Sequence, residues 1–389
     1  MKKVIYSLII TILFAISTLG ISYAYTFGML SHDDTIESIQ AIETTHNITL
    51  PMISFIRDDY NTQAQDVISR LWSTLGTGRV YHITLSPHEY TAEQVVGGYF
   101  DREYGLLFKN IKRTGIKVIF RTMHEMNGWR YPRSGNPEHF KKARIHIHQL
   151  AREAGLNQSQ ILFDFSTNGW DMPTKGWELA SQSAHLITCT QQHKKQSSCL
   201  TREDYYPWDE YVDLMGVTFY NRGKATSNRQ RLNPWQIMEE SRFTIWKRLV
   251  NANKPIIIDE VGTSSIWYEW TYDRTTSLQH YKSNSGHILK NIRLGQLAAW
   301  ARSKPQIAAL SYFNVDRTIG LAWENPWEAD RSTIDLSNGR YYSSIMRLYQ
   351  WWEQNLIKLF ITAEQKRKEG IGTWKKGAVK KKTTTKTNK

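Results

Sequence analysis

Eight short apolar runs, separated by helical or long connecting segments, restrict the fold of this 389-residue chain more than any other feature. Short runs rich in Val, Ile, Leu and Phe are typical of strands buried on both faces of a parallel sheet. Because parallel strands need a crossover between them, the alternation predicts a single α/β domain, a (β/α)8 TIM barrel. The expected strands cover residues 25–30, 51–56, 79–85, 118–120, 161–165, 212–220, 255–259 and 307–313.

The connecting segments show helical spacing of apolar residues and are closed by helix-breaking residues such as Gly115 and Gly155. A polar, irregular section over 171–211 takes the place of a helix after the fifth run. The expected helices cover residues 33–45, 64–75, 91–112, 137–154, 233–251 and 287–303.

The barrel is expected to fill residues 25–364, between two ends of different composition. At the N-terminus, Lys2 and Lys3 precede a mainly apolar segment that closes with Ser22–Tyr23–Ala24, the layout of a secretory signal peptide. The apolar segment is also nearly long enough to span a membrane. Residues 1–24 are therefore either a cleaved signal or a retained anchor, and both alternatives predict a secreted or cell-surface protein.

The net charge of +14 gathers at the two ends of the chain. Residues 1–24 contribute +2, and the tail 365–389 carries ten Lys and Arg against Glu369 alone. The body between them is nearly neutral, which argues against a basic surface for nucleic acid. We interpret the tail as a disordered, solvated end, with contact to a membrane or to an anionic wall polymer as the alternative.

Cys189 and Cys199 lie ten residues apart in the polar stretch after the fifth run. In an exported protein this spacing indicates a local disulfide, which we expect here. Two thiolates without neighbouring ligands make a poor zinc site, so neither a metal nor an organic cofactor is expected.

Two glutamates stand at the ends of buried runs: Glu125 after the fourth and Glu260 after the seventh. One such acid alone is as readily a helix cap or the partner of an arginine. Two of them at the ends of barrel strands, with His124 and Asn127 beside the first, predict one enzyme site. Paired carboxylates suit glycoside hydrolysis, with Glu125 as the acid and Glu260 as the ionised nucleophile.

Three stretches resemble glycoside hydrolase family 26. They are the Arg–Thr–Met–His–Glu–Met–Asn–Gly string over 121–128, the segment 211–220 that ends in Tyr220, and the Lys–Pro–Ile–Ile–Ile–Asp–Glu–Val–Gly string over 254–262. The resemblance runs from about Phe27 to the loop around Trp323. It implies a retaining endo-acting hydrolase, most often of β-1,4-mannan, with Glu125 as acid/base and Glu260 as nucleophile. It also implies a role for His124 near the acid/base and a hydrogen bond from Tyr220 to the nucleophile.

One position departs from the family pattern. An aromatic residue is expected five residues after the acid/base, where this chain has Arg130, with Trp129 one residue earlier. The departure leaves the polysaccharide open, since the family also acts on β-1,3-xylan and mixed-linkage β-glucan.

The fifteen tryptophans divide by position. Those with helical spacing are expected in the core, whereas four follow strand ends, where a flat ring can stack on a sugar. These four are Trp129, Trp170, Trp267 and Trp323. Two histidines at helical positions, His146 and His148, are expected at the surface, because a spacing of two places them on different faces.

We therefore expect a monomeric, secreted hydrolase whose partner is a polysaccharide and which does not bind nucleic acid. Its expected substrate contacts are His124, Asn127, Trp129, Trp170, Tyr220, Trp267 and Trp323. The alternative is a wall protein that binds carbohydrate without cleaving it. Against that alternative, binding alone does not require two carboxylates.

Overall fold

The structure is a computed structural model, and it describes residues 26–31, 36–57, 69–70, 72–85, 87, 89–127, 131, 136–169, 201–221, 234–239, 245–263 and 286–314. The segment 1–24, the tail 365–389 and both cysteines lie outside these residues. Their predicted cleavage or anchoring, disorder and disulfide therefore stay predictions. Within the described part of the chain, no helix combines the length and the apolar character that crossing a membrane requires.

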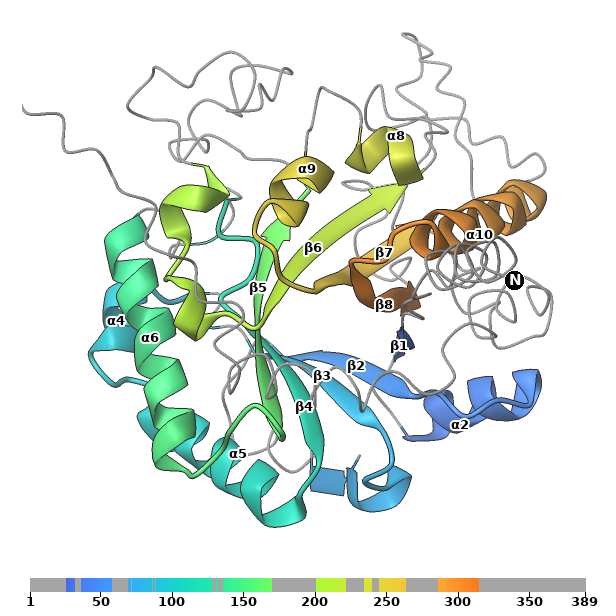
Figure 1. The fold of residues 1–389 in the computed structure, drawn as a ribbon. Coiled ribbons are helices and arrows are strands. Elements are labelled where there is room, and N and C mark those ends of the chain that lie inside the picture. The colour runs from blue at the N-terminus through green and yellow to red at the C-terminus, as the bar shows by residue number, and fades with distance from the viewer. Residues whose placement is uncertain are drawn as a thin grey trace, which may run out of the picture.

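The strands are β1 (Thr26–Ser31), β2 (Met52–Arg57), β3 (Val80–Leu85), β4 (Lys117–Thr122), β5 (Ile161–Asn168), β6 (Leu214–Asn221), β7 (Ile256–Thr263) and β8 (Ile307–Asn314). They form a closed barrel in which each strand pairs with the next in the sequence and β8 pairs in parallel with β1 (Figure 1). The predicted (β/α)8 barrel is confirmed, and each expected strand overlaps an observed one.

The helices lie outside the strands (Figure 1). They are α2 (Ile36–His46), α4 (Ala92–Val96), α5 (Asp101–Thr114), α6 (Pro137–Glu153), α8 (Pro234–Met238), α9 (Ile245–Val250) and α10 (Gly286–Arg302), with the short 3-10 turns η2 (Arg202–Tyr205) and η3 (Asp209–Tyr211). The α-helices contribute apolar residues to the core around the barrel. Phe108 of α5, for example, meets Phe120 of β4 edge to face, with ring centroids 5.3 Å apart.

The single helix predicted over 91–112 is two helices, α4 and α5. The chain turns between them at Gly98, whose φ of +82° is a left-handed conformation that favours glycine. The histidine prediction was half wrong. His148 of α6 is buried, with its ring 4.7 Å from that of Phe163 and 5.2 Å from that of Tyr211, whereas His146 is partly exposed beside Asp101.

The interior of the barrel has an apolar floor and a polar layer above it. Successive side chains of a strand point to opposite faces, so the next inward residue is two positions further on. The floor consists of Met52, Val80, Ile119, Leu162, Leu214, Ile257 and Ala309. Two residues after each of these come Ser54, His82, Arg121, Asp164, Gly216, Asp259 and Ser311. Every strand from β2 to β8 therefore changes from apolar to polar or glycine at the same level.

An irregularity in β7 brings a second acid to this interior. Val217 of β6 pairs with Ile258, but the next residue, Thr218, pairs with Glu260, which leaves Asp259 as an extra residue in β7. Such a bulge interrupts the alternation of side chains. Two consecutive acids, Asp259 and Glu260, can therefore both turn toward the inside of the barrel.

Candidate active site

Glu260 is the more buried of the two predicted acids, with 9% of its surface exposed. Its Oε1 accepts a hydrogen bond from Arg121 Nη1, and its Oε2 accepts one from the Tyr220 hydroxyl. The second contact is the one that the family resemblance implied for Tyr220. The carboxylate is thereby held at both oxygens by side chains from β4 and β6.

Arg121 is fully buried, and each of its three nitrogens has an oxygen partner. Its Nε donates to Ser166 Oγ at 2.8 Å and its Nη2 to Thr218 Oγ1 at 2.8 Å, in addition to the bond to Glu260. The guanidinium therefore has one orientation, set from β5, β6 and β7 together. A planar donor fixed in this way can also fix the carboxylate that it binds.

Three carboxylates influence the pKa of Arg121. Burial disfavours the charged form of Arg121, but the carboxylates outweigh burial and raise its pKa above the ordinary value. They belong to Glu260, Asp259 and Glu125. The two predicted catalytic acids thus act on one buried arginine, although they come from the ends of strands that are not neighbours, β4 and β7.

Glu125 lies beyond the end of β4 and is partly exposed. Met123 and Glu125 have φ values of 51° and 53°, a left-handed conformation that non-glycine residues rarely adopt. The turn is tied to the neighbouring strand, because the Glu125 amide donates to the Ser166 carbonyl at 3.0 Å. Backbone conformations of this kind persist where the surrounding structure imposes them, and they cluster at functional sites.

His124 and Asn127 lie on the same turn and are both buried. The His124 ring meets the Tyr131 ring edge to face, with centroids 5.7 Å apart. The Asn127 side chain bonds the backbone of Asn168 in both directions, accepting from its amide at 2.8 Å and donating to its carbonyl at 3.2 Å. Asn127 therefore joins the β4 turn to the end of β5, and a direct substrate contact by it stays a prediction.

The four tryptophans predicted to stack on sugars lie outside the described residues. They are Trp129, Trp170, Trp267 and Trp323. Their role as substrate contacts stays a prediction, as does the catalytic role of each glutamate.

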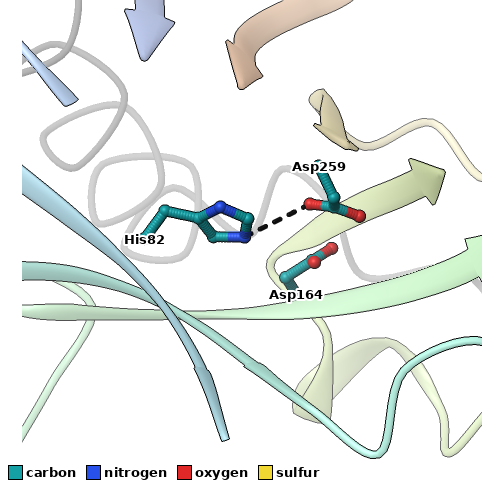
Figure 2. Close-up of side chains that lie close together, drawn as sticks. All are labelled: His82, Asp164 and Asp259. Carbon is teal, nitrogen blue, oxygen red and sulfur yellow. Dashed lines mark ion pairs between the residues drawn. The ribbon is translucent and has the colours of Figure 1, made fainter. Parts of the chain in front are cut away.

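Besides Arg121, the polar layer holds an imidazole and two carboxyl groups, from His82, Asp164 and Asp259 (Figure 2). His82 Nε2 lies 3.4 Å from Asp259 Oδ1, and all three side chains are at most 1% exposed. This donor set is of a kind that can hold a metal ion. The guanidinium of Arg121, with Nε 3.8 Å from Asp259 Oδ2, already brings positive charge to one side of the cluster and disfavours a divalent cation there.

The sequence analysis did not include Arg121, His82, Asp164 or Asp259 among the site residues. A signal was present, because Arg121 and Asp164 each interrupt an apolar strand, and charged side chains are rarely buried without partners. What the sequence alone could not show is which groups those partners are.

No protein-family model matches the chain. Endoglucanase H of Acetivibrio thermocellus is 24% identical over 196 residues, which are 49% of this chain and 19% of that protein. The aligned part thus spans about a fifth of the length of that relative.

Several solved structures are similar to this chain. One is a modular endo-β-1,4-mannanase from Cellulomonas fimi, of glycoside hydrolase family 26, with a TM-score of 0.50 and 11% identity over 84% of this chain and 74% of that chain. Another is the catalytic domain of a family 26 endo-β-1,4-mannanase from Bacillus sp. JAMB-750, with a TM-score of 0.48 and 15% identity over 84% of this chain and 90% of that chain. At these identities the likeness concerns the fold, and the Cellulomonas fimi structure agrees with the barrel described above.

Proposed function

We propose that this protein is a retaining glycoside hydrolase of the family 26 type, which cleaves a β-linked polysaccharide with Glu125 as acid/base and Glu260 as nucleophile. The observation that carries the proposal is the arrangement around Arg121. This buried cation binds Glu260 directly and is also influenced by Glu125. Two carboxyl groups from different strands, one tightly held and one partly exposed, suit such a reaction.

The reaction takes two steps. In the first, Glu125 gives its proton to the glycosidic oxygen while Glu260 attacks the anomeric carbon, so that the leaving sugar departs and a glycosyl-enzyme forms. In the second, Glu125 takes a proton from water, and the water oxygen replaces Glu260 at the anomeric carbon. The chain then has both carboxyl groups in their starting states. This mechanism predicts carboxyl groups about 5–5.5 Å apart.

The contacts of Glu260 support the nucleophile role. A nucleophilic carboxylate must be ionised and correctly aimed before the substrate arrives, because reorientation during the reaction slows it. Arg121 and Tyr220 donate to the two oxygens of Glu260 and hold the carboxylate in one orientation. Glu125, on a turn at the strand end, has the partly exposed position that an exchanging proton requires.

The substrate we favour is β-1,4-mannan, cleaved within the chain. Support comes from the motifs around Glu125 and Glu260 and from the family 26 mannanases that share the fold. Arg130, in place of the expected aromatic residue, keeps β-1,3-xylan and mixed-linkage β-glucan as alternatives. The similarity to an endoglucanase is a specific reason to keep the β-glucan.

The compartment is part of the proposal. The composition of residues 1–24 supports export, through either a cleaved signal or an anchor, and a polysaccharide substrate is found outside the cytoplasm. The basic tail over 365–389 would add a contact with an anionic wall or membrane surface.

The test is the release of reducing ends from mannan, galactomannan, β-1,3-xylan and mixed-linkage β-glucan, with the Glu260→Ala variant as the control. We expect release from one of these polymers, mannan first, and none by the variant. Binding to the same polymers without release by the native protein would overturn the proposal in favour of a carbohydrate-binding protein.

A further inference from the structure

The carboxyl groups of Asp164 and Asp259 lie side by side in the polar layer, and glycine makes the room for them (Figure 2). A Cβ added at Gly216 would lie 2.1 Å from Asp259 Oδ2 and 2.4 Å from Asp164 Oδ1. Both carboxyl groups therefore occupy the space that a side chain at position 216 would need. At most 1% of either aspartate is exposed, so water does not separate them from the protein.

Among the described residues, none of the four carboxyl oxygens of this pair receives a hydrogen bond from another donor. Most nearby donor atoms bind other oxygens, although Arg144 Nε and His82 Nε2 have no hydrogen-bond partner among the described residues. Arg121 binds Glu260, Thr218 and Ser166, and the Arg144 guanidinium donates to the backbone carbonyls of Thr122 and Asp164, at 3.0 and 2.7 Å. These guanidinium groups therefore place no hydrogen between the two carboxyl groups. A hydrogen bond between the carboxyl groups requires that one of them is itself protonated.

The two buried carboxyl groups have oxygens within 4.8 Å of each other, and the charge of each opposes ionisation of the other. We propose that Asp164 and Asp259 share one proton, with Asp164 as a neutral acid that donates a hydrogen bond to ionised Asp259. The pair then holds a single negative charge directly behind Arg121 and the nucleophile. The shared proton is independent of the proposed hydrolase activity, whereas its effect on Glu260 rests on that function.

The assignment of the proton to Asp164 follows from a chain of hydrogen bonds across the barrel. Ser311 Oγ donates to Ser54 Oγ at 2.7 Å, and Ser54 Oγ lies 3.1 Å from His82 Nδ1. Because Ser54 accepts from Ser311, its own hydrogen is available to Nδ1 of the imidazole. Nδ1 then accepts, so Nε2 carries a ring hydrogen, and Nε2 lies 3.4 Å from Asp259 Oδ1 (Figure 2).

The charges around the pair agree with this assignment. Asp259 has the imidazole of His82 on β3 and the guanidinium of Arg121 on β4 beside it. Burial, followed by the charge of Asp259, raises the pKa of Asp164 well above its usual range, against the opposing influence of Arg121 and of Arg144 on α6. Asp259 is thus the better-supported anion and Asp164 the acid.

A second negative charge here would compete with Glu260 for Arg121, which is the only guanidinium bound to Glu260 among the described residues. With a single negative charge on the pair, Arg121 stays oriented toward Glu260. Ionised Asp259 then balances part of the charge of Arg121, whose Nε lies 3.8 Å from Asp259 Oδ2. The pair is therefore a positioning device for Glu260 and does not touch the substrate.

The direct test is infrared difference spectroscopy of the whole protein in H2O and D2O at neutral pH. We expect the carbonyl band of one buried protonated carboxylic acid in the native protein. The band should be lost in Asp164→Asn, where the remaining Asp259 accepts from the new amide. It should be unchanged in Asp101→Asn, which alters an exposed carboxylate paired with His146. A native protein without this band would overturn the proposal, whatever its activity.

A second measurement uses the pH dependence of unfolding. An acid whose pKa is raised in the folded state binds a proton that the unfolded chain has released above its ordinary pKa of about 4. From that pH up to the folded-state pKa, each pH unit should raise the unfolding equilibrium constant of the native protein about tenfold relative to Asp164→Asn. Equal slopes in the two proteins would contradict a protonated Asp164.

A bound divalent cation is the competing explanation of the cluster. Elemental analysis of the purified protein distinguishes the two explanations, because a stoichiometric metal that disappears in Asp164→Asn would replace the shared proton.

The effect on Glu260 is tested separately by combining Asp164→Asn with Asp259→Asn, which removes the remaining negative charge of the pair beside Arg121. We expect kcat of the double variant to fall about tenfold below that of Asp164→Asn, a change of about 1.4 kcal/mol in the barrier, with KM little changed. Equal kcat values would overturn the positioning role. A native protein with no hydrolase activity would refute the proposed function and leave the infrared and unfolding tests valid.

Discussion

Glu260 at the β7 end of the barrel and Glu125 at the β4 end are held in different ways. Glu260 lies within its strand, is 9% exposed, and accepts hydrogen bonds at both oxygens from Arg121 and Tyr220. Glu125 lies beyond its strand on a left-handed turn, is partly exposed, and is attached through its backbone amide to Ser166. One strand end thus holds a carboxylate in a fixed position, while the other presents a carboxyl group that water can reach.

This difference shows how one barrel can give two chemically identical side chains separate tasks. An anion held by two donors is suited to attack, whereas an acid at the edge of the site can exchange a proton with substrate and water. The bulge in β7 contributes to the difference, since it places Asp259 beneath Glu260 in the interior. No comparable pair of acids occurs in β4, whose inward residues are Ile119 and Arg121.

The largest effect is expected at the tightly held end. Glu260→Ala removes the group that forms the glycosyl-enzyme, so turnover should fall by about 10⁵-fold or more, for natural and activated substrates alike. Initial rates on mannan and on a dinitrophenyl glycoside measure this. Glu138→Ala, which alters an exposed carboxylate paired with Lys141, is the matched control and should keep full activity. Substantial turnover by Glu260→Ala would show that the nucleophile lies elsewhere.

A smaller, substrate-dependent effect is expected at the exposed end. Glu125→Ala should slow the hydrolysis of polysaccharide by about 10²–10⁴-fold, the usual contribution of a general acid. A dinitrophenolate leaves without protonation, so this variant should still form the glycosyl-enzyme from an activated glycoside. Azide should then restore turnover and give the β-azide, because two displacements retain configuration. The α-azide from Glu125→Ala would reverse the two roles.

The smallest of these effects is expected when Glu260 loses its hydrogen bond from Tyr220. Tyr220→Phe removes one of the two hydrogen bonds to Glu260, and a bond to a charged group is worth about 1.5–3 kcal/mol, which corresponds to about 10–150-fold in kcat. Tyr104→Phe is the control, because its hydroxyl is buried and bonds Thr122 Oγ1 at 2.9 Å on the outer side of the barrel. It should lower the melting temperature and leave kcat unchanged. Equal kcat losses in the two variants would mean that Tyr220 acts only through stability.

Much of the fold could be predicted because its signals are local. Each strand appears as a short apolar run, and a break such as Gly115, with a φ of 71°, ends a helix wherever the rest of the chain lies. The two strand-end glutamates were visible for the same reason, since parallel strands of a barrel must present their carboxyl ends on one face. Helix boundaries were less certain, and the division of 91–112 into α4 and α5 depended on a turn that the apolar spacing did not reveal.

The sequence by itself therefore determined the barrel, the strands that carry Glu125 and Glu260, and the positions at which polar residues interrupt the apolar interior. Only the tertiary structure decided which of those residues meet. Arg121 reaches Glu260 across 139 positions of the chain, and Ser311 reaches Ser54 across 257. Such contacts depend on the register between strands, on the bulge at Asp259 and on the closure of β8 against β1. A local pattern contains none of these, because a shift of one residue in register would turn the same side chains to the opposite face.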